Sequence, residues 1–155
     1  MDFPLKLQLP FTFKTINDFK IARFQDNNMQ NPRPHWHMMI PSKDGSFFLV
    51  AVITSQYDKR VAYYRNTKQP KAIKSLVKIN NNEFSFLNKD SFINCNVTEY
   101  VSHSELIHRI DETAGFKLYD DTIPAYLRKD IVSAIVQSPL VSKFVGNIAK
   151  EANPL

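Results

Sequence analysis

Phe47-Phe48-Leu49-Val50-Ala51-Val52-Ile53 is the stretch of sequence that decides the fold. Its residues are apolar without interruption and most are β-branched or aromatic, which favours a buried strand over a helix. The turn signal Ser42-Lys43-Asp44-Gly45 precedes it, and a second apolar run, His37 to Ile40, stands before that turn. The two runs therefore predict a β-hairpin around Asp44-Gly45.

Further strands are predicted on the C-terminal side of the hairpin. Val61-Ala62-Tyr63-Tyr64 is a third strand candidate, and Ser91 to Val97 alternates apolar and polar residues in part, which is typical of a half-buried strand. Asn80-Asn81-Asn82 predicts a turn between them. The opening segment, Leu5 to Phe24, fits either a strand or a helix.

The last third of the chain has helical patterns. Ser102-His103-Ser104-Glu105 fits a capping box at a helix start, and Gly115 is a candidate for the end of that helix. Tyr126 to Gln137 carries apolar residues at the spacing of one helical face. Ser138-Pro139 predicts the start of another helix, with serine as the cap and proline in the first turn.

These patterns predict a single α+β domain over residues 1–155, mainly a β-barrel in 1–100 and mainly helical in 101–155. A length of 155 residues is near the usual size of one domain. A small barrel or curled antiparallel sheet, with helices packed at one side, is the simplest arrangement of these elements.

Composition narrows the class of protein. The three glycines are too few for a glycine-rich phosphate loop, so nucleotide binding of that kind is excluded. The single cysteine, Cys95, excludes an internal disulfide framework and a multi-cysteine zinc site, and it favours a reducing compartment. Residues 1–10 lack the pattern of a signal peptide, and no apolar run is long enough to span a membrane. We therefore expect a cytoplasmic protein that does not act at a membrane.

Positive charge is concentrated in the first two thirds of the chain. Residues 1–98 carry 14 Lys/Arg and 7 Asp/Glu, a net charge of +7, whereas residues 99–155 carry 6 and 8, a net charge of −2. The densest part runs from position 59 to 78, where seven cations occur without a carboxylate. Such a segment can follow a phosphate backbone while tyrosine rings stack on unpaired bases, or it can be a solvated surface. The predicted nucleic-acid-binding residues are Lys59, Arg60, Tyr64, Arg65, Lys68, Lys71 and Lys74.

A second cluster, Arg33-Pro34-His35-Trp36-His37, suits chemistry on RNA. On a strand His35 and His37 would face the same side, because successive side chains alternate. Arg33 could stabilise negative charge on a phosphorane-like transition state while a histidine moves a proton. Two histidines could also contribute to a metal site, but no further ligand is close in sequence. The alternative is that Trp36 belongs to the core and the histidines only flank it.

Two hydroxyl side chains end the most apolar strand. Thr54 and Ser55 follow directly on Val52-Ile53, and a strand end can present polar groups to a groove. The pair also fits a simple turn cap.

In this order the segments resemble the MazF/PemK (Kid) family of toxin endoribonucleases, which share a fold with the CcdB gyrase poisons. Arg33-Pro34 precedes one apolar strand, and Thr54 lies 21 residues after Arg33, in the motif Val52-Ile53-Thr54-Ser55 that ends a second strand. Leu87 then precedes Ser91-Phe92-Ile93, and Ser102 to Ile110 supplies a closing helix. The resemblance covers roughly residues 30–116.

The resemblance implies an SH3-like β-barrel with a helix after the last strand and two C-terminal helices, normally as a homodimer. It also implies cleavage of single-stranded RNA without metal or another cofactor, as part of a toxin–antitoxin system with a cognate antitoxin. The ribose 2′-hydroxyl would be the nucleophile. Carried over by motif, Arg33 is the phosphate-stabilising acid or cation, Thr54 positions or activates the reacting group, and Ser55 assists. His35 and His37 are not part of the family motif, and we add them to the predicted catalytic residues because of their own chemistry.

Two alternatives remain open at this level. One is a non-catalytic barrel that binds nucleic acid or a protein, either a gyrase-like target or an antitoxin. The other gives the C-terminal helices a docking role, for a second copy or an antitoxin, through apolar residues such as Leu140 and Phe144, although we expect these residues to complete the core of the chain itself.

Overall fold

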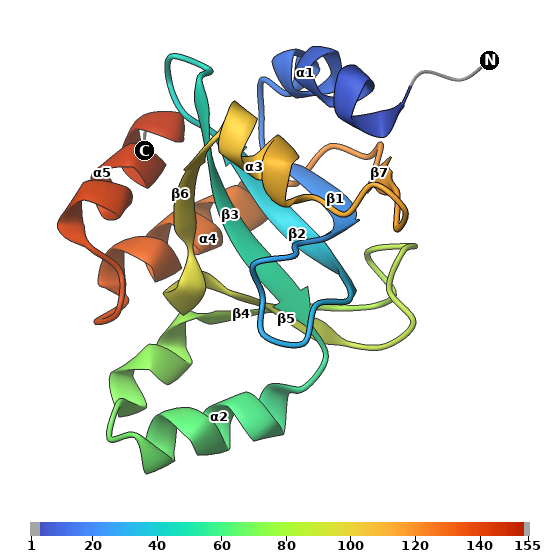
Figure 1. The fold of residues 1–155 in the computed structure, drawn as a ribbon. Helices are drawn as coiled ribbons and strands as arrows, with labels where there is room; N and C mark the ends of the chain where they lie inside the picture. Colours follow the sequence, from blue (N-terminus) through green and yellow to red (C-terminus); the bar gives the residue numbers. More distant parts are fainter. Residues whose placement is uncertain (1–3, 154–155) are drawn as a thin grey trace.

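A computed structural model describes residues 4–153 as an α+β protein built on one antiparallel sheet (Figure 1). The domain predicted over 1–155 thus includes residues 1–3 and 154–155, which lie outside the described part. The elements in chain order are α1 (Leu5–Thr15), β1 (Lys20–Gln25), β2 (Pro34–Pro41), β3 (Phe47–Thr54), α2 (Tyr57–Asn66), the 3-10 helix η1 (Pro70–Ser75), β4 (Leu76–Ile79), β5 (Ser91–Asn94), the 3-10 helix η2 (Cys95–Val97), β6 (Glu99–Ser102), α3 (His103–Arg109), β7 (Phe116–Leu118), α4 (Ala125–Gln137) and α5 (Lys143–Ala152).

The predicted hairpin is confirmed and lies at the centre of the sheet. β2 and β3 pair in register from Trp36 opposite Ile53 to Pro41 opposite Phe48. Gly45 closes the turn with a φ of +76°, a backbone conformation that favours glycine. Both faces of the hairpin are covered, which explains why β3 is apolar from Phe47 to Ile53 and does not alternate.

The sheet has seven strands, in the order β4-β5-β3-β2-β1-β7. β6 lies off this path and pairs with the first half of β3, whereas β5 pairs with its last residues, Ile53 and Thr54. Over the described residues the sheet does not close on itself. The α+β class and the antiparallel sheet are therefore confirmed, and a closed SH3-like barrel is not.

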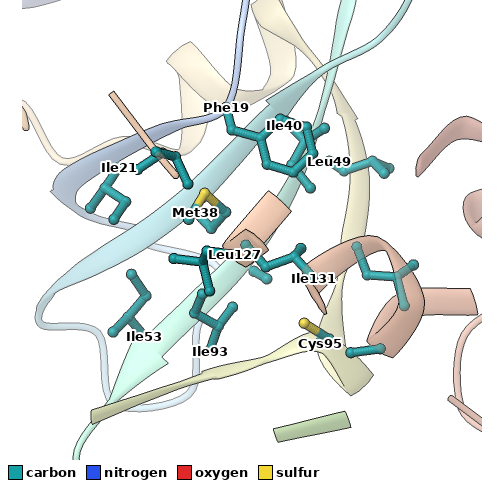
Figure 2. Close-up of a cluster of buried hydrophobic side chains, with 14 of the residues drawn as sticks. Phe19, Ile21, Met38, Ile40, Leu49, Ile53, Ile93, Cys95, Leu127 and Ile131 are labelled. Atoms are coloured by element: carbon teal, nitrogen blue, oxygen red, sulfur yellow. The ribbon is translucent and has the colours of Figure 1, made fainter. Parts of the chain in front are cut away.

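Alternation along the strands creates two cores, one on each face of the sheet. Met38, Ile40 and Leu49 point to the face covered by α4 and α5, where they pack with Leu127 and Ile131 (Figure 2). The other face is covered by α1 and α3 and is filled by a separate buried set: Leu9, Phe13, Ile16, Ala22, Phe24, Met39, Phe48, Val50, Val101, Leu106 and Ile110. The ambiguous opening segment supplies α1 to this second core and β1 to the sheet.

Two of the predicted helices are confirmed and a third begins later than expected. Ser102 caps α3 by accepting a hydrogen bond from the Glu105 N–H, and α4 extends to Gln137 as predicted. Ser138 does not cap a helix. Its hydroxyl donates to Asn96 Oδ1 at 2.7 Å, and α5 begins four residues after Pro139 with Ser142 as its cap.

The predicted strand at 61–64 is wrong, because this segment belongs to α2. Tyr57, Val61 and Tyr64 recur at helical spacing and pack in a third small core with Leu76 and Phe92. The apolar pair Tyr63-Tyr64 looks strand-like in the sequence, yet only Tyr64 is buried.

Two boundaries also differ from the predictions. The strand predicted over 91–97 ends at Asn94, whose side chain accepts a hydrogen bond from the Asn96 N–H and starts the turn η2. Gly115 does not end the preceding helix. α3 stops at Arg109 because Ile110 forms a β-bridge with Asp26.

The core on the α4 face can be tested with Ile131→Ala. Ile131 is fully buried between α4 and the sheet, so the substitution should lower the free energy of unfolding by about 3 kcal/mol. Chemical denaturation gives the value. Lys129→Ala, an exposed position on the same helix, is the control and should change stability by less than about 0.5 kcal/mol. Equal effects of the two changes would contradict the packing described here.

Candidate functional site

A groove of about 280 Å³ lies where β2 begins and β3 ends. These ends are neighbours because the strands are antiparallel. Four of the five predicted catalytic residues line this groove together: Arg33, His35, Thr54 and Ser55. The loop that follows β4 forms the opposite wall through Phe86 to Lys89, with the ring of Phe86 4.5 Å from that of Trp36.

Arg33 and His35 are joined by two hydrogen bonds. Arg33 Nε donates to His35 Nε2 at 3.4 Å, and His35 Nδ1 lies 3.0 Å from the Arg33 carbonyl oxygen. Because a guanidinium can only donate, Nε2 is the acceptor and Nδ1 carries the proton. Burial lowers the pKa of His35, and the nearby positive charge of Arg33 acts in the same direction. The imidazole is therefore neutral at pH 7, and its Nε2 lies beside the Arg33 guanidinium.

Thr54 and Ser55 stand across the groove at the end of β3. The Thr54 hydroxyl oxygen accepts a hydrogen bond from the Gln56 N–H at 3.3 Å, which orients the side chain. The hydroxyl proton is then free to be donated to a phosphate oxygen. The groove thus combines a cation, a neutral base and hydroxyl donors.

His37, the fifth predicted catalytic residue, lies deeper on the same face of β2 as His35. The two ring centroids are 6.3 Å apart, as expected for alternating positions of a strand. His37 is stacked on Phe24 at 4.0 Å, and within residues 4–153 its Nδ1 has no hydrogen-bond partner. Burial lowers its pKa to about 4. It belongs to a second cavity, next to the groove and not in it.

That second cavity contains an ion network that sequence reasoning missed. Arg109, at the end of α3, donates to both carboxylate oxygens of Asp26 and, at 2.8 Å each, to both oxygens of Glu99. Burial raises the pKa of Asp26, but the hydrogen bonds from Arg109 and from the Asn28 N–H outweigh it and hold the pKa below its usual value. The network fastens the start of the β1–β2 loop to α3. One signal in the sequence could have indicated the network. Arg109 is a charged residue on the side of the helix that carries the apolar Leu106 and Ile110, where a buried charge needs a partner.

The predicted nucleic-acid-binding residues lie on α2 and on or beside η1, and we call their cations together the basic surface. Lys59, Arg60 and Arg65 lie on α2, and Lys68, Lys71 and Lys74 lie on or beside η1. Except for the half-buried Arg60, which lines the second cavity, these side chains are exposed. Tyr64 is different. It is 2% exposed and hydrogen-bonded to Asn94, so its ring is not available to a base, whereas the neighbouring Tyr63 is exposed.

Comparison with known proteins gives no match. A scan against protein-family models, a search of curated proteins and a search of solved structures each found none. In the part of the chain that the structure describes, no helix combines the length and apolar character needed to cross a membrane.

The burial of His37 predicts a pH-dependent stability. The unfolded chain takes up a proton near the usual pKa of 6.5, whereas the folded chain does so only near 4. The unfolded state thus binds more protons in this window, and stability is lost as the pH falls from about 6.5 to 4. His37→Phe removes this dependence, so between pH 7 and pH 4 it should lose about 3 kcal/mol less stability than the unmodified protein. Urea denaturation at each pH measures it. His108→Phe, on the exposed part of α3, is the control, and equal slopes for His37→Phe and the parent would contradict the prediction.

The ion network predicts a large effect of removing Arg109. Arg109→Met leaves the buried Asp26 carboxylate without its cation, which should cost about 3–5 kcal/mol of stability at pH 7. The loss should shrink as the pH falls, because the Asp26 carboxylate that lacks its cation in the variant is then protonated. The double variant Asp26→Asn/Arg109→Met should recover part of the loss, because no uncompensated charge remains. A double variant as unstable as the sum of the single ones would show that the two side chains act independently.

Proposed function

We propose that this protein is a toxin-like endoribonuclease that cuts single-stranded RNA without a metal ion. The observation that carries the proposal is the convergence of Arg33, His35, Thr54 and Ser55 on one groove at the joined ends of β2 and β3. These residues are separated in the sequence but supply together a phosphate-binding cation, a proton acceptor and hydroxyl donors. Cleavage through the ribose 2′-hydroxyl needs these groups.

In the proposed reaction His35 Nε2 takes the proton of the 2′-hydroxyl, and the 2′-oxygen attacks the adjacent phosphorus. A bond forms between the 2′-oxygen and phosphorus, and the bond from phosphorus to the 5′-oxygen breaks. Arg33 moves its hydrogen bond from His35 to the phosphate, where it neutralises the added charge. Thr54 and Ser55 hold the non-bridging oxygens. The 5′-oxygen is protonated by solvent, so the products are a 2′,3′-cyclic phosphate and a 5′-hydroxyl.

The basic surface supports RNA as the substrate. α2 begins two residues after Ser55, which lines the groove, and it carries three of the six cations. Six neighbouring cations attract a phosphate backbone through counterion release. The ring of Tyr63, 52% exposed and 5.3 Å from the Arg60 guanidinium, offers a face for stacking on an unpaired base.

The proposal extends to the location, the oligomeric state and the protein partner of the chain. The resemblance to MazF/PemK toxins suggests a cytoplasmic homodimer controlled by an antitoxin, with a curled sheet related to their SH3-like barrel. His37 does not line the groove, so its part in proton transfer is not included in the proposed reaction.

The proposal is tested by incubating the purified chain with mixed-sequence single-stranded RNA in EDTA. We expect cleavage, with a 2′,3′-cyclic phosphate at the new end. Arg33→Ala and Thr54→Ala should each lower the rate by about 100-fold or more, since each removes a group that stabilises the transition state. Lys143→Ala, an exposed lysine on α5, serves as a control for the loss of a positive charge and should cut at the unmodified rate.

Two results would overturn the proposal. One is the absence of any cleavage product, and the other is an unchanged rate in both groove variants. Salt-sensitive binding of RNA without cleavage would instead favour the non-catalytic nucleic-acid-binding protein.

A further inference from the structure

Two aromatic rings are shared by the groove and a hollow beside it. Trp36 of β2 and Phe86 of the loop between β4 and β5 line the groove, and both also line a neighbouring hollow of about 310 Å³. We call this hollow the side pocket and the two rings the aromatic pair. Other residues that line the side pocket are Lys117, Tyr119, Asp120 and Asp121. The proposed reaction uses neither ring.

The rings of the aromatic pair are held in place by the protein itself. Their centroids are 4.5 Å apart, and the ring of Phe86 also packs edge-on against that of Tyr119 at 4.8 Å. Tyr119 is 9% exposed, and Trp36 packs against the core on the α4 face. Trp36 and Phe86 themselves are only partly buried. A ligand therefore meets accessible aromatic surface whose conformation is already fixed, so that little conformational entropy is lost on binding.

The loop that carries Phe86 is attached to the rest of the fold on the N-terminal side of the ring. Phe84 is 3% exposed and belongs to the core on the α4 face. Glu83 accepts hydrogen bonds from Asn80 and from the Tyr126 hydroxyl of α4. The position of the Phe86 ring thus follows from contacts with the core and with α4.

Charge differs between the two hollows. The groove is lined by the cations Arg33 and Lys89, and among the described residues that line it there is no carboxylate. The side pocket has one cation, Lys117, against two carboxylates, Asp120 and Asp121. A phosphate is therefore attracted to the groove and repelled from the side pocket, which suits an uncharged group.

This combination selects a class of ligand. The aromatic pair fits a flat ring, the side pocket disfavours an anion, and the groove next to it favours a phosphate. A nucleotide of a single strand has both parts, a neutral base and a charged phosphate, joined at a short distance. Bases stack on aromatic side chains through their π-faces, and every base has such a face.

We propose that Trp36 and Phe86 stack on a base of the RNA strand whose phosphate lies in the groove, with that base directed into the side pocket. The inference rests on the proposed function for its link to a strand that is cut. Stacking fixes the strand beside Arg33 and His35 and is tolerant of the identity of the base. The aromatic pair is therefore a binding element of the site and not part of its proton transfer.

The test uses binding, so that it does not depend on catalysis. Trp36 is the single tryptophan of the chain, so the indole fluorescence reports on this site alone. A short oligothymidylate has no 2′-hydroxyl and cannot be cut by the proposed reaction. Its titration into the full chain should quench the indole emission, and the quenching should saturate together with the fluorescence anisotropy of a labelled strand. A strand of the same length and charge that lacks the bases should leave the emission unchanged.

Phe86→Leu supplies the matched change in the protein. It keeps an apolar side chain but removes the ring, so oligothymidylate should bind about tenfold more weakly. Phe144→Leu makes the same change on α5, where the ring is 55% exposed and contacts Tyr100, and it should leave the affinity unchanged. The quenching is measured in the unmodified protein, so it remains decisive even if Phe86→Leu is poorly folded.

Several outcomes would overturn the inference. They are a failure to bind oligothymidylate, binding that leaves the indole emission unchanged, equal quenching by the strand without bases, and unchanged affinity in a folded Phe86→Leu variant. If RNA is cut but the strand does not quench the indole, the nuclease stands and this inference fails. If quenching is found without any cleavage of RNA, the stacking site stands and the nuclease fails.

Discussion

The antiparallel pairing of β2 with β3 is the constraint on which the rest of the structure depends. Its register places His37 opposite Val52 and Met38 opposite Ala51. A slip of one residue would turn each of these side chains to the other face and exchange the contents of the two cores. The same pairing brings the start of β2 to the end of β3. The interaction that forms the cores therefore also makes the groove.

Much of this framework could be predicted from short-range signals. The apolar run at 47–53, the turn at Asp44-Gly45 and the serine cap at position 102 act within a few residues, and each produced the expected element. The failures have a different origin. The stretch 61–64 is apolar in the manner of a strand, but its burial is decided by contacts with β4 and β5. Ser138 has a side chain suited to a helix cap, yet its hydroxyl donates a hydrogen bond to Asn96, 42 residues away.

The residues of the candidate site fall into the same two groups, those placed by short-range signals and those placed by contacts distant in sequence. Arg33, His35, Thr54 and Ser55 could be predicted to share a site because they flank two strands of one hairpin, and hairpin pairing is a local matter. The Asp26–Arg109–Glu99 network could not, since it joins the end of β1, the end of α3 and the start of β6. Whether the Tyr64 side chain is exposed or buried also depends on contacts distant in sequence. A tyrosine among cations is equally suited to stacking and to burial, and the hydrogen bond to Asn94 decides for burial.

The Asp26–Arg109–Glu99 network joins residues far apart in the sequence, so it can form only late in the synthesis of the chain. Arg109 fastens the loop that leads to Arg33 across a separation of 83 residues from Asp26, and β1 gains its second neighbour only from β7. A ribosome-bound chain that ends before Arg109 cannot hold the loop in this way. The basic helices α2 and η1 pack against β4 and β5, and all of these residues precede Arg109 in the chain, so they do not depend on it. α2 and η1 can thus fold during translation before the groove has its final geometry.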